Sequence, residues 1–346
     1  MKLVTIAGTR PEIIKLAYLI PLLNNNFNHK FIYTGQHFSP NMSDIFIDEL
    51  KVKPDYDLQS NSSDITTIKT KMLPVLKSIS PDYVVVYGDT NSSMAAALAA
   101  NEINSKIIHV EAGVRDFDMH VPEEPLRIKI DEMADYLFSP SSFCTTVLSY
   151  ENISGKVFTT GNLIVDVCND LSKIALSREI PESVPQEFLL LTLHRPENVD
   201  NSKNLGLLMN HIASTEYPVI FPVHPRTKKN LQNFNVGVPS NVTLIDPLGY
   251  MDFLSLMSKS KLILTDSGGI QEEAITIKKA CITLRHTSAR WETILLKSNI
   301  LFPPDREDSL HEVINMMIEA KIFKNPYGEN IAEKILEIMK NELIGR

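Results

Sequence analysis

The segment Thr265–Glu273, with the sequence Thr-Asp-Ser-Gly-Gly-Ile-Gln-Glu-Glu, combines residue types that could bind a nucleoside diphosphate. It follows the apolar run Leu262–Leu264 and precedes a helical pattern, so its Ser-Gly-Gly unit lies where a strand turns into a helix. A helix N-terminus offers unpaired N–H groups and a positive dipole end, and glycines let a phosphate approach the backbone. Glu272 and Glu273 lie one turn further on, where a carboxylate could hold a ribose diol. The alternative is a glycine-permitted turn with a serine cap.

Two basic residues follow the first expected strand and could neutralise a diphosphate. They belong to the segment Gly8-Thr-Arg-Pro-Glu-Ile-Ile-Lys. Pro11 suits the first turn of a helix, so Arg10 would lie in the preceding loop and Lys15 in the first turns of the helix. The alternative for Arg10 and Lys15 is a solvated pair of basic side chains.

Three carboxylates of the first half could act as acids or bases. Asp89 follows an apolar run and would be either a helix N-cap or a catalytic group. Glu111 comes directly after another buried run and before a glycine turn, where surface solubility does not explain a carboxylate. Glu123 opens a helical pattern with Arg127 four residues later, a spacing that would also suit an ion pair on a helix face.

Two residues of the second half complete the set. His194 follows a strand and could bind phosphate or transfer protons, with a structural histidine as the alternative. Arg290 follows the strand after the Gly-Gly helix and could reach the same ligand. His224 also follows a strand, but the proline after it favours a role in a turn.

All these residues follow short apolar runs that alternate with longer amphipathic ones. Strands of about five residues, each followed by a helix, predict β-α units and a parallel sheet. The pattern restarts after Asp170, and Ser177–Gln186, with two prolines and several charges, is the best linker candidate. The sequence therefore predicts an α/β protein with two Rossmann-like domains that face each other across a cleft, where strand ends bind ligands.

The expected first domain is 1–165 with a C-terminal helix at about 330–346, and the second domain is 166–329. The expected strands are Leu3–Ala7, Phe31–Thr34, Tyr83–Tyr87, Ile107–Val110, Tyr136–Phe138, Val157–Thr159, Phe188–Leu193, Val219–Pro222, Val242–Ile245, Leu262–Thr265, Cys281–Leu284 and Ile300–Phe302. The expected helices include Pro11–Leu23, Ile65–Ser78, Ser92–Ile103, Asn204–Ser214, Met251–Met257 and Asn330–Leu343.

Bulk composition excludes several functional classes. The net charge of -8 argues against a general nucleic-acid binder, although it leaves room for a local phosphate site. No apolar run approaches the ~18 residues of a membrane span. Cys144, Cys168 and Cys281 are far apart, which predicts neither a metal site nor a disulfide framework and fits a reducing cytoplasm.

Taken in order, these segments resemble the nonhydrolysing UDP-N-acetylglucosamine 2-epimerase family. The matching stretches are Gly8-Thr-Arg-Pro-Glu-Ile-Ile-Lys15, Gly88-Asp-Thr90, His109-Val-Glu-Ala-Gly113, Pro122-Glu-Glu124 with Arg127, Gly161-Asn162, His194-Arg-Pro-Glu-Asn198, His224-Pro225 and Thr265–Glu273. The resemblance implies a fold like that of GT-B glycosyltransferases and a cytoplasmic homodimer. It also implies a UDP-sugar substrate and no metal, nicotinamide or other cofactor.

The resemblance also implies a role for each site residue. Asp89, Glu111 and Glu123 match the essential carboxylates, and Lys15, Arg127 and Arg290 match positive groups near the phosphates or the sugar. The UDP contacts would be Arg10, His194, Ser267, Gly268 and Gly269 for the diphosphate, Glu273 for the ribose and Phe253 for the uracil. The family's reaction eliminates UDP across C1–C2 of the sugar to give a glycal, then adds UDP back after protonation of the other face.

The chain departs from the family pattern in one loop and leaves the sugar open. Arg285-His-Thr-Ser-Ala-Arg-Trp-Glu292 stands where the family usually has Arg-Asp-x-Thr-Glu-Arg-Pro-Glu. Gly35-Gln-His37 is similar to the bacterial segment that helps bind a second, activating UDP-sugar. The alternatives to epimerisation of UDP-N-acetylglucosamine are the same chemistry on another UDP-2-acetamido sugar (a diacetamido-uronate or 6-deoxy sugar), a hydrolysing epimerase, a glycosyltransferase and a nucleotide-sugar-binding protein without activity.

Overall fold

The structure is a computed structural model that describes residues 1–36, 52–179, 184–320 and 324–344. His37 of the segment similar to the activating site therefore lies outside the described residues, as do residues 180–183 of the expected linker. The chain divides into two compact units, Met1–Val167 with Pro326–Arg346, and Cys168–Asn325. The first boundary falls within helix α8 (Ile164–Leu176).

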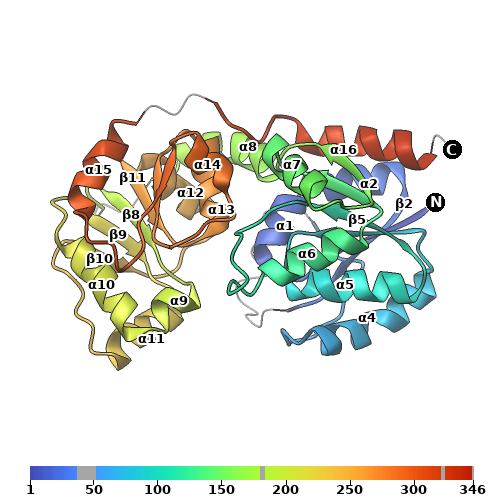
Figure 1. Cartoon of the computed structure of the whole chain (residues 1–346), viewed down its shortest axis with the longest axis horizontal. Coiled ribbons are helices and arrows are strands. Elements are labelled where there is room, and N and C mark those ends of the chain that lie inside the picture. Colours follow the sequence, from blue (N-terminus) through green and yellow to red (C-terminus); the bar gives the residue numbers. More distant parts are fainter. Residues whose placement is uncertain (37–51, 180–183, 321–323, 345–346) are drawn as a thin grey trace. The chain divides into compact units, whose positions relative to one another are not determined.

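The first unit is built on a parallel sheet of seven strands in the order β3-β2-β1-β4-β5-β6-β7 (Figure 1). The β-branched run Tyr-Val-Val-Val-Tyr of β4 is buried on both faces, as expected for a central parallel strand. The strands are β1 (Lys2–Ala7), β2 (Asn28–Tyr33), β3 (Tyr56–Asp57), β4 (Tyr83–Tyr87), β5 (Lys106–Val110), β6 (Tyr136–Ser139) and β7 (Lys156–Thr159).

Helices follow most strands of this unit, and the C-terminal segment packs against it. Asp166 of α8 accepts the backbone N–H groups of Ile331 and Ala332, at 3.1 and 2.8 Å, and so caps α16, which lies against α2. The helices are α1 (Arg10–Leu16), α2 (Leu19–Asn26), α4 (Ile65–Ile79), α5 (Asn91–Glu102), α6 (Glu124–Met133), α7 (Ser142–Tyr150), α8, α16 (Ile331–Met339) and a π-helical turn at Lys340–Ile344.

The second unit is built on a parallel sheet of six strands in the order β10-β9-β8-β11-β12-β13. Its core joins apolar side chains of these strands to the inner faces of α10 and α15. The strands are β8 (Leu189–Thr192), β9 (Val219–Pro222), β10 (Val242–Ile245), β11 (Leu262–Thr265), β12 (Cys281–Thr283) and β13 (Asn299–Leu301). The helices are α9 (Pro196–Val199), α10 (Ser202–Ala213), α11 (Pro225–Asn233), α12 (Tyr250–Lys259), α13 (Gly268–Thr276), α14 (Trp291–Leu295) and α15 (Leu310–Ile318).

The predicted α/β class with two parallel sheets is confirmed, and every expected strand is present, with ends that differ by three residues at most. The prediction of one helix over Pro11–Leu23 is wrong, because the segment forms two helices, α1 and α2, that break at Ala17–Tyr18. The sequence also missed β3, which is two residues long and exposed, so it carries no periodic signal.

The order of strands marks one ligand-binding edge in each sheet. The chain runs outward from β1 to β3 and then returns to β4 beside β1, and in the second sheet it runs from β8 to β10 and returns to β11 beside β8. Ligands of open parallel sheets bind at the carboxyl ends of the strands at such a reversal. Arg10 and Asp89 follow β1 and β4, and His194 and Ser267 follow β8 and β11. The topology therefore places most predicted site residues at the two reversal points.

Candidate active site

Glu111 lies at the carboxyl end of β5 with a backbone φ of +75°, in the left-handed region that non-glycine residues seldom adopt. Its side chain is buried and its Oε2 atom accepts two hydrogen bonds, from Lys15 Nζ at 2.6 Å and from the Tyr87 hydroxyl at 2.5 Å. Lys15 comes from α1 and Tyr87 from the end of β4. The structure thus pairs two predicted residues, Glu111 and Lys15, and adds one, Tyr87, that the sequence analysis missed.

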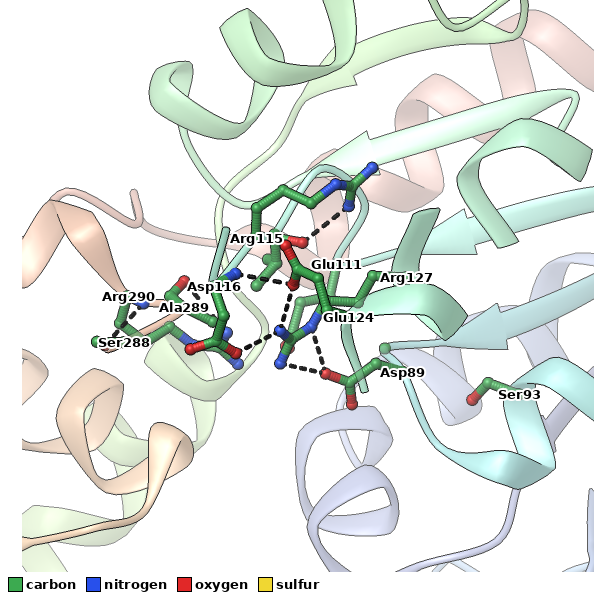
Figure 2. A network of polar contacts seen from close by, with 12 residues as sticks. Asp89, Ser93, Glu111, Arg115, Asp116, Glu124, Arg127, Ser288, Ala289 and Arg290 are labelled. Carbon is green, nitrogen blue, oxygen red and sulfur yellow. Dashed lines mark hydrogen bonds and ion pairs between the residues drawn. The ribbon is translucent and has the colours of Figure 1, made fainter. Parts of the chain in front are cut away.

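Arg127 of α6 gathers three carboxylates at the same edge of the sheet (Figure 2). Its Nε and Nη2 atoms each lie 2.7 Å from Asp89 Oδ2, and its Nη1 atom lies 2.6 Å from Asp116 Oδ2 and 2.9 Å from Glu124 Oε2. Arg127, Asp116 and Glu124 are buried, whereas the Asp89 side chain is 24% exposed. The arginine therefore fixes Asp89 where a ligand can still reach its carboxylate.

The structure excludes one of the two predicted roles of Asp89, that of a helix N-cap. The N-cap of α5 is Thr90, whose hydroxyl accepts the Ser93 N–H at 3.1 Å, so Asp89 does not cap this helix. Glu123 is the N-cap residue of α6 and is half-buried. Its backbone carbonyl accepts the Arg127 N–H at 3.0 Å, which places the two residues one turn apart.

A buried carboxylate that the sequence analysis gave no role, Glu12, supports the loop before Arg10, which is the first residue of α1 and not a loop residue as predicted. Its Oε2 atom accepts the N–H groups of Gly8 and Thr9 at 2.9 and 2.7 Å, and its Oε1 atom accepts the hydroxyls of Thr90 and Ser93 at 2.9 and 3.0 Å. Burial raises the Glu12 pKa, although these hydrogen bonds oppose the shift. The spacing Thr-x-x-Glu at the start of a helix is the capping-box signal that could have found it.

A second buried network lies behind the Gly88–Asp89 turn. His109 of β5 places Nδ1 2.6 Å from Asp131 Oδ1 and Nε2 2.9 Å from the Gly88 carbonyl oxygen. Asp131 also accepts the Gly113 N–H at 3.0 Å and pairs with Arg115 at 2.8 Å. Burial works against ionisation of Asp131, but His109 and Arg115 outweigh it and keep its pKa below the ordinary value.

In the second unit, Asp266 fastens the loop after β8 to the end of β11. This fully buried carboxylate accepts the N–H groups of His194 and Arg195, at 3.1 and 2.9 Å, and the side-chain amide of Asn198 at 3.2 Å. The imidazole Nδ1 of His194 lies 3.3 Å from Asp266 Oδ1, and the His194 side chain is 45% exposed. Asp266 was missed as a positioning residue because its partners lie about seventy positions away.

The N-terminus of α13 has the properties that the sequence predicted for a phosphate site. Ser267 is the N-cap, and Gly268 and Gly269 form the first turn. A Cβ atom added at Gly268 would meet only Arg290 Cζ, at 4.0 Å, and one added at Gly269 would meet nothing within 4 Å. Arg290 forms a buried ion pair with Glu272, whereas the next residue, Glu273, is half-buried. The two adjacent glutamates therefore differ in burial, since Glu272 is fully buried and Glu273 is partly exposed.

The loop before α14, which departs from the family pattern in sequence, is held in place by buried hydrogen bonds. Ser288 accepts the Arg290 N–H at 3.0 Å and donates to Gln271 Oε1 at 2.6 Å (Figure 2 shows the first of these). His286, at the position where the family usually has aspartate, is exposed and pairs with Asp305 at 2.7 Å. Phe253 lies half-buried in the first turns of α12.

His224 acts in a turn, as its proline neighbour predicted. Its Nδ1 atom accepts the Arg226 N–H at 3.2 Å and caps α11. Burial lowers the His224 pKa, and the charges of His194 and Arg226 lower it further. His194 is therefore close enough to His224 to lower the His224 pKa.

Comparisons with known proteins identify the family of the chain. A sequence model of the UDP-N-acetylglucosamine 2-epimerase family matches residues 22–340. The chain is 41% identical over 361 residues to UDP-N-acetylglucosamine 2-epimerase of Methanocaldococcus jannaschii, covering 98% of this chain and 99% of the relative. It is 35% identical over 320 residues to UDP-2,3-diacetamido-2,3-dideoxy-D-glucuronate 2-epimerase of Pseudomonas aeruginosa, covering 89% of this chain and 90% of the relative.

A solved structure shares the fold over nearly the whole chain. The crystal structure of the Methanocaldococcus jannaschii epimerase in complex with UDP-GlcNAc and UDP aligns with a TM-score of 0.91 at 41% identity, covering 98% of this chain and 99% of that one. Among the helices that the structure describes, none is long and apolar enough to cross a bilayer. The predicted resemblance is confirmed, and the chain belongs to the UDP-N-acetylglucosamine 2-epimerase family of isomerases.

Proposed function

We propose that this protein interconverts UDP-N-acetylglucosamine and UDP-N-acetylmannosamine by inverting C2 of the sugar. The observation that carries the proposal is Glu111, a buried carboxylate in a left-handed backbone conformation that shares one oxygen between Lys15 and Tyr87. A residue held in such a strained and desolvated position is typical of an active site. Family membership supports the choice of reaction.

The chemistry proceeds in two steps with a glycal between them. A carboxylate takes the C2 proton as the bond between C1 and the diphosphate oxygen breaks, and the bonding electrons leave with UDP. A proton is then delivered to the opposite face of C2 while the UDP oxygen forms the bond to C1 again. We assign the proton transfers and the stabilisation of positive charge at C1 to Asp89, Glu111 and Glu123.

The departing diphosphate needs positive groups and N–H donors. We assign this role to Arg10, His194, Arg290 and the N-terminus of α13 at Ser267, Gly268 and Gly269. The positive partial charges of the N–H groups at this helix end would stabilise the negative charge that develops on the diphosphate. Lys15 and Arg127 hold Glu111 and Asp89 in place. Glu273 would bind the ribose, and Phe253 would lie against the uracil.

The test is proton exchange in deuterated water. We expect incubation with UDP-N-acetylglucosamine to place deuterium at C2 and to give a mixture of the two epimers that favours the gluco form, both followed by NMR. Accumulation of free N-acetylmannosamine and UDP would instead identify a hydrolysing enzyme. Absence of exchange at C2 would contradict the proposed substrate.

A second candidate substrate is another UDP-2-acetamido sugar. The altered segment Arg285–Glu292 and the diacetamido-uronate relative favour this candidate. Exchange with UDP-2,3-diacetamido-2,3-dideoxyglucuronate, but not with UDP-N-acetylglucosamine, would support it.

The resemblance further supports a cytoplasmic homodimer, and light scattering of the purified protein would measure its mass against the 38.9 kDa of one chain.

A further inference from the structure

Tyr87 contacts Glu111 from the neighbouring strand. It is the last residue of β4 and pairs in register with Val110, the residue before Glu111. Its side chain is buried, and its hydroxyl donates to Glu111 Oε2 at 2.5 Å. Hydrogen bonds to an ionised carboxylate are stronger than those between neutral groups, so the hydroxyl stabilises the charged form of Glu111.

Lys15 acts on the same oxygen and on the tyrosine ring. Its ammonium donates to Glu111 Oε2 at 2.6 Å and lies 5.4 Å from the centroid of the Tyr87 ring, within range of a cation–π contact. Tyr87 therefore holds both members of the ion pair. A proton on Oε2 would have to displace one of these two donors, so the geometry directs protonation to Oε1.

We propose that Tyr87 is a positioning residue for the epimerisation, because its hydroxyl and Lys15 together keep Glu111 ionised and direct proton uptake to Oε1. This inference rests on the proposed function. The Oε1 atom lies on the side of Gly88, where an added Cβ would come within 3.9 Å of it. Proton transfer would then occur beside the turn that carries Asp89.

The other charged groups named at this edge have partners of their own. Arg127 is directed at Asp89, Asp116 and Glu124. His109, two positions before Glu111 on β5, is directed at Asp131, which also pairs with Arg115. Removal of the Tyr87 hydroxyl should therefore act mainly through Glu111 and Lys15.

Tyr87→Phe tests the inference because it removes the hydroxyl and keeps the ring. Without this donor Glu111 holds its proton to a higher pH, so the acidic limb of the kcat/KM profile should move up by about one pH unit. At pH values above the limb, kcat/KM should return to within about threefold of the wild-type value. The profile is measured from both epimers, and an acidic limb unchanged in both directions would overturn the inference.

Two further variants separate this effect from packing. Tyr83→Phe removes a hydroxyl at the other end of the same strand, where the ring packs edge-on against Tyr136, and should leave the profile unchanged. Replacement of Tyr87 by 3-fluorotyrosine keeps the hydrogen bond but makes the hydroxyl a stronger donor. The acidic limb should then move to lower pH, opposite to the effect of phenylalanine, and movement in the same direction would contradict the inference.

A titration that needs no turnover distinguishes this inference from the proposed function. In protein labelled with ¹³C at glutamate carboxyl groups, Glu111→Gln identifies the Glu111 signal. Its titration midpoint should rise in Tyr87→Phe, and an equal midpoint would overturn the role of Tyr87. If the wild-type protein exchanges no C2 proton in any UDP-2-acetamido sugar, the proposed function fails. The titration would still determine whether the Tyr87 hydroxyl stabilises the ionised form of Glu111.

Discussion

At the scale of residues, the site is built from charges that are buried in pairs. An isolated carboxylate loses several kcal/mol on leaving water, so a buried Glu111 requires the donors that Lys15 and Tyr87 supply. Its left-handed backbone adds about 1–3 kcal/mol of strain. A buried glutamate with a strained backbone costs stability, so its presence at this position indicates a functional role.

Not every buried titratable group serves the site, and His29 shows the contrast. Its ring contacts Asn24 Oδ1 at 2.6 Å and Thr5 Oγ1 at 2.8 Å, an arrangement that suits a neutral imidazole donating through Nδ1. Burial lowers the His29 pKa from 6.5 to about 4, and of two smaller effects the charge of Asp55 raises this pKa whereas the charge of Lys30 lowers it. The unfolded chain therefore binds this proton at a higher pH than the native protein does.

This difference predicts acid sensitivity. The stability that neutral His29 contributes is complete above pH 6.5 and is lost as the pH falls towards about 4. Between pH 7 and pH 5 the expected loss in the free energy of unfolding is about 2 kcal/mol. Urea unfolding at the two pH values should show a smaller loss in His29→Gln than in the wild type. His120→Gln, at a fully exposed site, serves as the control and should leave the loss unchanged. An equal loss in His29→Gln would contradict the assignment.

At the scale of elements, the N-terminus of α13 can be tested without disturbing the fold. Added Cβ atoms at Gly268 and Gly269 meet no close neighbour, and neither residue has a positive φ. Gly268→Ala should therefore fold normally but weaken UDP binding by about tenfold or more, because the methyl group keeps the phosphate away from the backbone N–H groups. Isothermal titration calorimetry with UDP measures the effect.

Gly206 provides the matched control for this helix. It lies in α10, and an added Cβ there also meets nothing within 4 Å. Gly206→Ala should raise the free energy of unfolding by about 0.5–1 kcal/mol, since alanine favours a helix interior, and should leave UDP binding unchanged. Equal UDP affinity in Gly268→Ala and the wild type would contradict the proposal that the diphosphate binds at the N-terminus of α13.

At the scale of the whole molecule, the two units carry different parts of the proposed work. The acids lie on the sheet of the first unit, and the helix end and His194 lie on the sheet of the second. This division predicts that Glu111→Gln and Asp89→Asn lower C2 exchange by at least about 10²-fold and keep the rise in melting temperature that UDP produces. Glu132→Gln, an exposed acid on α6, is the control for exchange. Retained exchange in both variants would contradict their catalytic role.

The sequence by itself determined the class of fold and the residues that we propose for the chemistry. Short β-branched runs such as Tyr83–Tyr87 form buried strands, and glycines and acids follow these strands in the sequence. Because the strands of each sheet are parallel, their carboxyl ends meet at one edge, where the loops that carry these residues lie. The ordered motifs identified the family because each is a local stretch of sequence, and most lie where a strand ends or a helix begins. Local patterns were therefore enough for Gly268, Asp89 and Glu111 to be named.

Only the tertiary structure decided which of these groups work together. Lys15 and Glu111 are 96 positions apart, and Arg127 and Asp89 are 38 apart, so no periodicity links them. Tyr87 looked like one more strand residue until the register of β4 and β5 placed its hydroxyl on Glu111. Strand order and the need to pair each buried charge fix such contacts, and both arise only when the sheets assemble.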